Sequence, residues 1–146
     1  GGSGTYWISA FAPGITEIEA GGGIYGCVRY RKSFGVEVES ALTVLSTVTS
    51  RPTADRIICD AGFKATGNVS PDPELRNISD CALIKFSAEH GIITLSKGTP
   101  QPRVGDTIEF VPGYSDSAIF LHEYLYGVRD GLVETVWPVI GRGKLQ

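Results

Sequence analysis

Two glycine-rich segments near the start of the chain have the composition of anion-binding loops. The first is Gly1-Gly2-Ser3-Gly4-Thr5, and the second is Ala20-Gly21-Gly22-Gly23-Ile24-Tyr25. Glycine has no Cβ and tolerates positive φ, so successive backbone N–H groups can approach a phosphate closely. We interpret the two segments together as a phosphate site, because they lie at the ends of consecutive strand-like units. Tight turns without a ligand are the alternative interpretation.

A second candidate site lies in residues 112–117, after an expected strand. Tyr114 and Asp116 are two residues apart in a segment that we expect to be extended, so their side chains would point to the same side. Oxygen ligands in such a pair suit a hard metal ion or a polar substrate. A polar turn with a solvated aspartate is the alternative.

Few other residues have side chains suited to proton transfer near neutral pH. His90 and His122 are the two histidines, and we expect each to make a structural hydrogen bond. Asp60 and Lys64 flank an expected turn, where an acid and a base more often form a structural contact than a nucleophilic pair. Nothing around Lys64 indicates the desolvated pocket that a Schiff-base lysine requires.

Composition excludes several classes of protein. The 146 residues carry a formal net charge of −3, without charged blocks, which disfavours nucleic acid and anionic membranes as partners. No apolar run approaches the roughly 20 residues that span a bilayer, and the first residues do not resemble a signal peptide. The three cysteines are widely spaced, which favours reduced thiols over a zinc site or a disulfide framework. We therefore expect a soluble, cytoplasmic protein.

The pattern of apolar and turn-forming residues divides the chain near residue 35. Residues 5–14 suit a short helix, and residues 15–20 alternate like a short strand that ends at glycine. From residue 36 onward, β-branched and aromatic runs bounded by turn formers predict a mostly antiparallel β domain. We expect a surface loop over residues 65–80 and a hairpin at Arg129-Asp130-Gly131. The expected strands comprise residues 41–50, 56–60, 81–86, 91–95, 107–112, 124–128 and 132–139.

A series of motifs in a fixed order then carries a family resemblance. These are Gly-Gly-Ser-Gly-Thr-Tyr at the start, residues 13–22, Val48-Thr49-Ser50-Arg51-Pro52, Asp60-Ala61-Gly62, Ser87-Ala88-Glu89-His90-Gly91, Val104-Gly105-Asp106 and Trp137-Pro138-Val139. In this order and spacing, the chain resembles the C-terminal part of the D-threonine aldolase and D-serine dehydratase-like family. The resemblance runs from end to end. It implies an alanine racemase-like, fold type III arrangement, in which residues 1–35 end an α/β barrel and residues 36–146 form a C-terminal β domain.

The resemblance also implies a cofactor and the residues that hold it. The cofactor would be pyridoxal 5′-phosphate, with its phosphate held by Ser3, Gly4 and Thr5 from the first loop and by Gly21 and Gly22 from the second. The Schiff-base lysine of the family lies near the start of the barrel, a position that no lysine of this chain matches. Because the chain also begins inside the first loop, we expect it to be the later part of a longer enzyme, and a homodimer.

The resemblance further places a divalent metal, zinc or manganese, in the segment after Val104-Gly105-Asp106. Family members have a histidine there, followed two residues later by an aspartate or a cysteine. This chain keeps Asp116 but has Tyr114 in place of the histidine. A neutral phenol is a poor ligand beside imidazole, so the metal is either bound differently or dispensed with. In the second case, Tyr114 is a candidate to hydrogen-bond the substrate hydroxyl or to act in acid–base catalysis.

Two functions follow as hypotheses. In the first, the chain is the cofactor-phosphate and β-domain portion of a lyase that acts on D-3-hydroxy amino acids by aldol cleavage or by dehydration. The chain would then be catalytically incomplete without the N-terminal part of the enzyme. The second is a non-catalytic β module that dimerises or binds a phosphorylated small molecule. A covalent lysine adduct after treatment with pyridoxal phosphate and borohydride would favour an autonomous enzyme.

Overall fold

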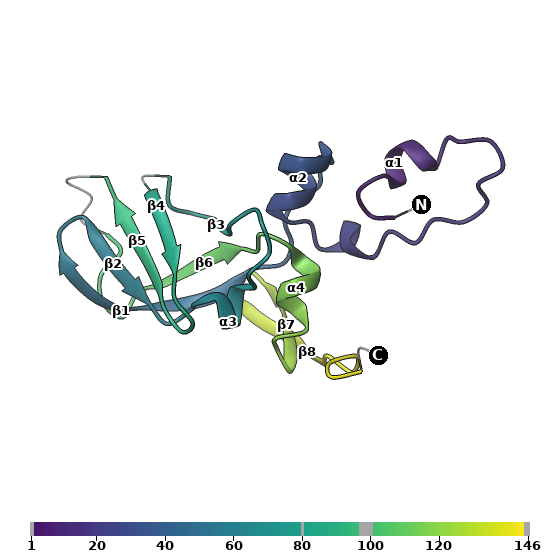
Figure 1. The fold of residues 1–146 in the computed structure, drawn as a ribbon. Helices are drawn as coiled ribbons and strands as arrows, with labels where there is room; N and C mark the ends of the chain where they lie inside the picture. The colour runs from purple at the N-terminus through teal and green to yellow at the C-terminus, as the bar shows by residue number, and fades with distance from the viewer. Residues whose placement is uncertain (1, 80, 97–100, 145–146) are drawn as a thin grey trace.

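The computed structural model describes residues 2–79, 81–96 and 101–144. Its N-terminal segment contains α1 (Tyr6–Ser9), the 3-10 helix η1 (Gly21–Ile24) and α2 (Val28–Phe34). Figure 1 shows α1 and η1 on an arm that extends away from the β sheet, with α2 lying between the arm and the sheet. The arm is largely exposed, and α2 is the part of this segment that packs on the body of the protein.

A six-stranded antiparallel sheet forms the body, and it confirms the prediction of mainly β structure after residue 36. The strands run in the order β3-β6-β1-β2-β5-β4. Their bounds are β1 Val44–Thr53, β2 Arg56–Cys59, β3 Glu74–Leu75, β4 Cys81–Phe86, β5 Gly91–Leu95 and β6 Thr107–Val111. The short helices α3 (Phe63–Thr66) and α4 (Ser115–Ile119) flank the sheet, and β7 (Tyr124–Arg129) with β8 (Leu132–Pro138) forms a separate two-stranded sheet.

Alternating apolar residues on these strands build the core, as the sequence predicts. In β6, Ile108 and Phe110 are both buried, while Thr107 is exposed. The Phe110 ring meets Phe86 edge to face with 5.5 Å between centroids. The other buried core residues are Val44, Val48, Ile57, Cys59, Ala61, Ile93 and Leu95. Cys59 and Cys27 are buried thiols in separate clusters, in agreement with their expected role as small apolar residues.

The hairpin predicted from Asp-Gly is confirmed. Asp130 has φ 50° and Gly131 has φ 77°, so both residues adopt the left-handed conformation that a tight two-residue hairpin turn requires. The expected strands at residues 81–86 and 91–95 are also confirmed, and they form the antiparallel pair β4–β5. Among the described residues, no helix is long and apolar enough to cross a bilayer.

Several local predictions are wrong. The surface loop expected over residues 65–80 contains a short strand, β3, which pairs with β6 at the edge of the sheet. Residues 15–20 form no strand, although they alternate, because the extended arm offers no neighbouring strand to accept their hydrogen bonds. The expected helix over residues 5–14 is also shorter than predicted, because it is a single turn, Tyr6–Ser9. The division of the chain into domains at residue 35 stays a prediction, although α2 does end there at Gly35, which has φ 63°.

Asp60 and Lys64 do not pair with each other. The Asp60 carboxylate accepts hydrogen bonds from the Ser46 hydroxyl and the Thr47 N–H, each at 2.8 Å, and the Thr47 N–H is the main reason that the pKa of Asp60 is lowered. Lys64 instead forms an ion pair with Glu89 at 2.6 Å. The Asp60 carboxylate therefore links the end of β2 to β1. Asp60 and Lys64 both have structural roles.

Candidate functional site

Helix α2 is fixed to the end of β6 by its first N–H groups. The Val28 N–H donates to the Pro112 carbonyl at 3.1 Å, and the Arg29 N–H donates to the Gly113 carbonyl at 2.9 Å. These carbonyls satisfy donors that the first turn of a helix leaves without intrahelical partners. The contact places the side chains of α2 next to Tyr114, although Tyr30 and Tyr114 lie far apart in the sequence.

Aromatic side chains cluster around the Arg29 guanidinium where α2 meets the end of β6. Tyr30 meets Tyr114 edge to face at 6.1 Å between centroids and lies 5.8 Å from Phe34. The Arg29 guanidinium carbon is 5.0 Å from the centre of the Tyr114 ring and 5.8 Å from that of Phe34. Such contacts hold a guanidinium by cation–π attraction while its N–H groups stay available to a ligand.

The two glycine-rich bends contact each other next to α2. The Gly22 N–H donates to the Ser3 hydroxyl oxygen at 2.8 Å. A Cβ on Gly22 would lie 2.2 Å from the Tyr30 hydroxyl oxygen, and one on Gly4 would lie 2.8 Å from the Phe34 ring. Both glycines are therefore required for close packing against α2, a role that the sequence pattern alone does not reveal.

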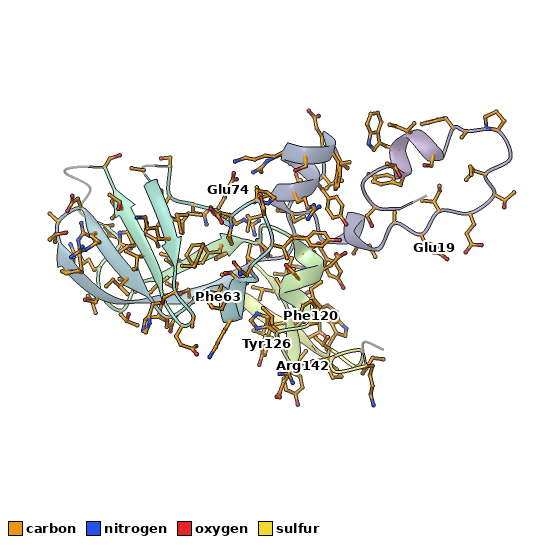
Figure 2. The ribbon with its side chains drawn as sticks, viewed as in Figure 1. Glu19, Phe63, Glu74, Phe120, Tyr126 and Arg142 are labelled. Carbon is orange, nitrogen blue, oxygen red and sulfur yellow. The ribbon has the colours of Figure 1, made fainter. Side chains whose placement is uncertain are left out.

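The first glycine-rich bend and the aromatic cluster share one pocket of about 460 Å3. Ser3 and Gly4 line it together with Tyr114 and Asp116, so the structure brings four of the predicted site residues together. Thr5, Gly21 and Gly22 are not among its lining residues. The remaining lining residues are Gly2, Glu19, Arg29, Tyr30 and Phe34. Glu19 lies on the arm just before η1, as Figure 2 shows.

Sequence reasoning missed Glu19, Arg29, Tyr30 and Phe34. One signal was present, since Tyr30 and Phe34 are four residues apart and lie on one face of a helix that begins directly after a glycine bend. No such signal marked Arg29, because its cation–π contact is with the ring of Tyr114, which lies far away in the sequence.

Tyr114 and Asp116 are neighbours, although not in the expected conformation. Tyr114 is extended, but Asp116 lies in the first turn of α4, so the segment is not a continuous strand. The Asp116 carboxylate accepts a hydrogen bond from the Tyr114 hydroxyl, and this bond, assisted by burial, raises the pKa of Tyr114 well above its ordinary value. Tyr114 is therefore a protonated hydrogen-bond donor at neutral pH, and Asp116 also accepts from the Ser115 hydroxyl at 3.2 Å.

The donors near Asp116 do not fit a metal ion. Across residues 2–79, 81–96 and 101–144, no three His, Cys, Asp or Glu side chains lie close enough together to hold one. A protonated phenol is a poor ligand, and a single carboxylate seldom binds a divalent cation by itself. His122 does not contribute, because its Nε2 lies 2.8 Å from the Ala65 carbonyl oxygen and has a structural hydrogen bond.

A larger pocket of about 700 Å3 lies elsewhere, beside β6, and contains none of the predicted site residues. Its two acids are already engaged. The Asp106 carboxylate accepts from the Arg103 N–H at 2.7 Å, and Glu109 pairs with Arg76 at 3.5 Å. The smaller pocket is therefore the candidate functional site.

Comparisons with known proteins identify the family of the chain. Residues 41–128 match the family model "Putative serine dehydratase domain". The chain is 33% identical to D-threonine aldolase from an Arthrobacter species, over 98% of this chain and 38% of that protein. It is 35% identical to 3-hydroxy-D-aspartate aldolase from Paracoccus denitrificans, over 99% and 39% respectively.

The fold matches as well. The crystal structure of D-threonine aldolase from Filomicrobium marinum superposes with a TM-score of 0.91 at 25% identity, over 99% of this chain and 41% of that one. The chain thus spans about two fifths of the length of these relatives. Because the family model covers more than half of the sequence and the fold agrees, the chain belongs to this serine dehydratase domain family, as its motifs predicted.

Proposed function

We propose that the chain is part of a pyridoxal phosphate-dependent lyase that acts on D-3-hydroxy amino acids. The observation that carries the proposal is the shared pocket, in which Ser3 and Gly4 of the glycine-rich bend face the same space as Tyr114 and Asp116. The names of the two aldolase relatives describe substrates that are D-amino acids with a 3-hydroxyl group, which supports this substrate class.

The glycine-rich bends fit the phosphate of the cofactor. Among the described residues, the N–H groups of Gly4 and Gly21 have no hydrogen-bond acceptor. The Ser3 oxygen accepts from Gly22, so its own O–H can donate to a phosphate oxygen. We therefore assign phosphate binding to Ser3 and Gly4, with Gly21 at the edge of the site. Gly22 orients Ser3, and Thr5, whose N–H donates to the Gly2 carbonyl, holds the bend closed.

We propose that the Schiff-base lysine comes from a part of the enzyme that this chain does not contain. Of the described lysines, none lines the pocket. Lys32 pairs with Glu74, which lies beside α2 in Figure 2, and Lys64 pairs with Glu89. The relatives are more than twice as long as this chain, which leaves room for a barrel portion with that lysine.

When bound, pyridoxal phosphate supplies an electron sink that allows a bond to Cα of an amino acid to break. The residues of this chain position the substrate around that bond. We assign Asp116 as the group that accepts the proton of the 3-hydroxyl at a carboxylate oxygen, and Tyr114 as the donor that orients this carboxylate. No metal takes part in this assignment, because the donor set around Asp116 does not fit one.

Replacement of Tyr114 with phenylalanine is expected to lower kcat of the complete enzyme about tenfold. The variant removes the hydrogen bond to Asp116 but keeps the ring that contacts Arg29 and Tyr30, and a bond to a charged group is worth about 1.5–3 kcal/mol. Steady-state kinetics would measure the effect. Tyr126→Phe is the matched control, because Tyr126 is 62% exposed on β7. Unchanged turnover in Tyr114→Phe would remove Tyr114 from the mechanism.

Cofactor titration tests the proposal as a whole. We expect the chain to bind pyridoxal phosphate reversibly, as followed by phosphorus-31 NMR, and to bind pyridoxal without its phosphate at least tenfold more weakly. Borohydride should trap no adduct at a specific lysine of this chain, but one adduct in the complete enzyme. Equal affinity for the two compounds would contradict the phosphate site. A specific adduct in this chain would instead favour an autonomous enzyme.

A second candidate, a non-catalytic module that dimerises, is favoured by one feature of the β7–β8 hairpin. Cross-strand pairing places Tyr126 opposite Val136 and Val128 opposite Val133 on one face, and all four side chains are exposed. A two-stranded sheet is marginally stable by itself, so an uncovered apolar face favours a partner. Dimerisation in sedimentation experiments, without any pyridoxal phosphate binding, would support this candidate over the lyase.

A further inference from the structure

The side chain of Arg29 occupies an unusual position in the pocket. Its backbone is held by the N–H bond to Gly113 in the first turn of α2. Its guanidinium lies over the faces of Tyr114 and Phe34, and among the residues that the structure describes Arg29 is the only cation that lines the pocket. Two aromatic faces restrict the guanidinium without using its hydrogen-bond donors.

Within the described residues, no carboxylate pairs with Arg29. Within the same residues, its guanidinium makes a single, long hydrogen bond, in which Nη1 donates to the Ser70 carbonyl oxygen at 3.5 Å. By contrast, the neighbouring Arg31 pairs with Glu74 on the outside of the same helix. Glu19 and Asp116 line the pocket, yet neither forms an ion pair with Arg29. A fixed, half-buried guanidinium with free donors is suited to bind a planar oxyanion in two-point fashion.

We propose that Arg29 binds the carboxylate of the amino acid substrate. This inference rests on the proposed function and deepens it, because it names a substrate-recognition residue that no sequence motif indicates. Arg29 is nearer to the Tyr114 ring than to Phe34, the ring against which Gly4 packs. It thus lies toward the end of the pocket where Asp116 would receive the substrate hydroxyl, while Ser3 and Gly4 face the cofactor phosphate.

The carboxylate assignment predicts a clear split between kinetic constants in the complete enzyme. Arg29→Gln should raise KM for a D-3-hydroxy amino acid about 30-fold or more, with kcat changed less than threefold. The reason is that the lost contact would stabilise the bound substrate and the transition state equally. Arg29→Lys should recover part of the affinity, since it keeps the charge but lacks the planar fork. Affinity for pyridoxal phosphate should change less than threefold in both variants. Arg31→Gln, on the same helix but outside the pocket, should behave as wild type.

A binding experiment on this chain alone separates the two possible oxyanions without using activity. The Nε–Hε signal of Arg29 in nitrogen-15 NMR, assigned by its loss in Arg29→Lys, would be followed during titration with succinate and, separately, with inorganic phosphate. We expect a saturable shift with succinate that is at least threefold larger than the shift with phosphate. The same shift should be present in Arg31→Gln.

Two results would overturn the inference. In the first, inorganic phosphate shifts the Arg29 signal and succinate does not, or Arg29→Gln weakens pyridoxal phosphate binding while KM stays the same; Arg29 would then bind the cofactor phosphate. In the second, neither anion shifts the signal. Failure of the proposed function is a different result, namely no pyridoxal phosphate binding by wild type, and it leaves the succinate response to decide whether Arg29 binds carboxylates.

Discussion

Replacement of Phe110 with alanine is expected to lower the free energy of unfolding by about 3–5 kcal/mol, as is usual for the loss of a fully buried aromatic ring. Phe110 is 0% exposed and contacts Phe86 edge to face. Its strand, β6, pairs with β1 on one side and with β3 on the other, so the strand is held in place and cannot shift to fill the cavity that the ring would leave in the core. Urea denaturation followed by circular dichroism would measure the loss.

The control for this experiment is a second phenylalanine on the N-terminal arm. Phe11 is 87% exposed, and its replacement with alanine should change the free energy of unfolding by less than about 0.5 kcal/mol. A loss below about 1 kcal/mol for Phe110→Ala would mean that β6 does not lie at the centre of the core. In that case the position of the pocket, which follows β6 directly, would also need revision.

Replacement of Gly22 with alanine should damage the pocket most strongly. The new Cβ would lie 2.2 Å from the Tyr30 hydroxyl oxygen, and Tyr30 is 3% exposed and has no room to withdraw. Overpacking of this kind costs about 1–3 kcal/mol. Displacement of Tyr30 would move Tyr114 and break the bond from Gly22 to Ser3, so affinity for pyridoxal phosphate should fall about 10- to 100-fold.

Gly21→Ala provides a matched control one residue away. A Cβ on Gly21 meets no atom within 4 Å, and the residue is exposed. Alanine also keeps the N–H group, which is all that Gly21 offers to a phosphate. The stability of the variant in thermal denaturation and its affinity for pyridoxal phosphate in phosphorus-31 NMR should therefore remain close to wild type. Equal losses in the two variants would show that flexibility of the whole bend matters, and would contradict the specific contact with Tyr30.

The β sheet could be predicted from the sequence because its signals are local. The strand expected over residues 107–112 is present as β6, where alternation buries Ile108 and Phe110, and Asp130-Gly131 correctly marked the β7–β8 turn. The same alternation failed in residues 15–20, because a strand needs a partner and the arm provides none. Periodicity reports which face could be buried, whereas pairing depends on what lies nearby in space.

The candidate site was predictable only in part, for a related reason. Ser3, Gly4, Tyr114 and Asp116 were identified from composition, spacing and resemblance, and they line one pocket. Arg29 was not identified, because its chemistry arises from a ring contributed by a distant segment. The geometry of Asp116 was also unexpected, since a short helix rather than a strand begins after Tyr114.

The two backbone hydrogen bonds between α2 and the end of β6 have a consequence for building chimeras from members of this family. A chimera that exchanges residues 1–35 alone would take Arg29 and Tyr30 from one parent and Tyr114 from the other, across bonds to Pro112 and Gly113 that require matched backbones. Crossover points should therefore keep the helix and residues 112–116 together as one inherited unit, even though most of the chain separates them in sequence.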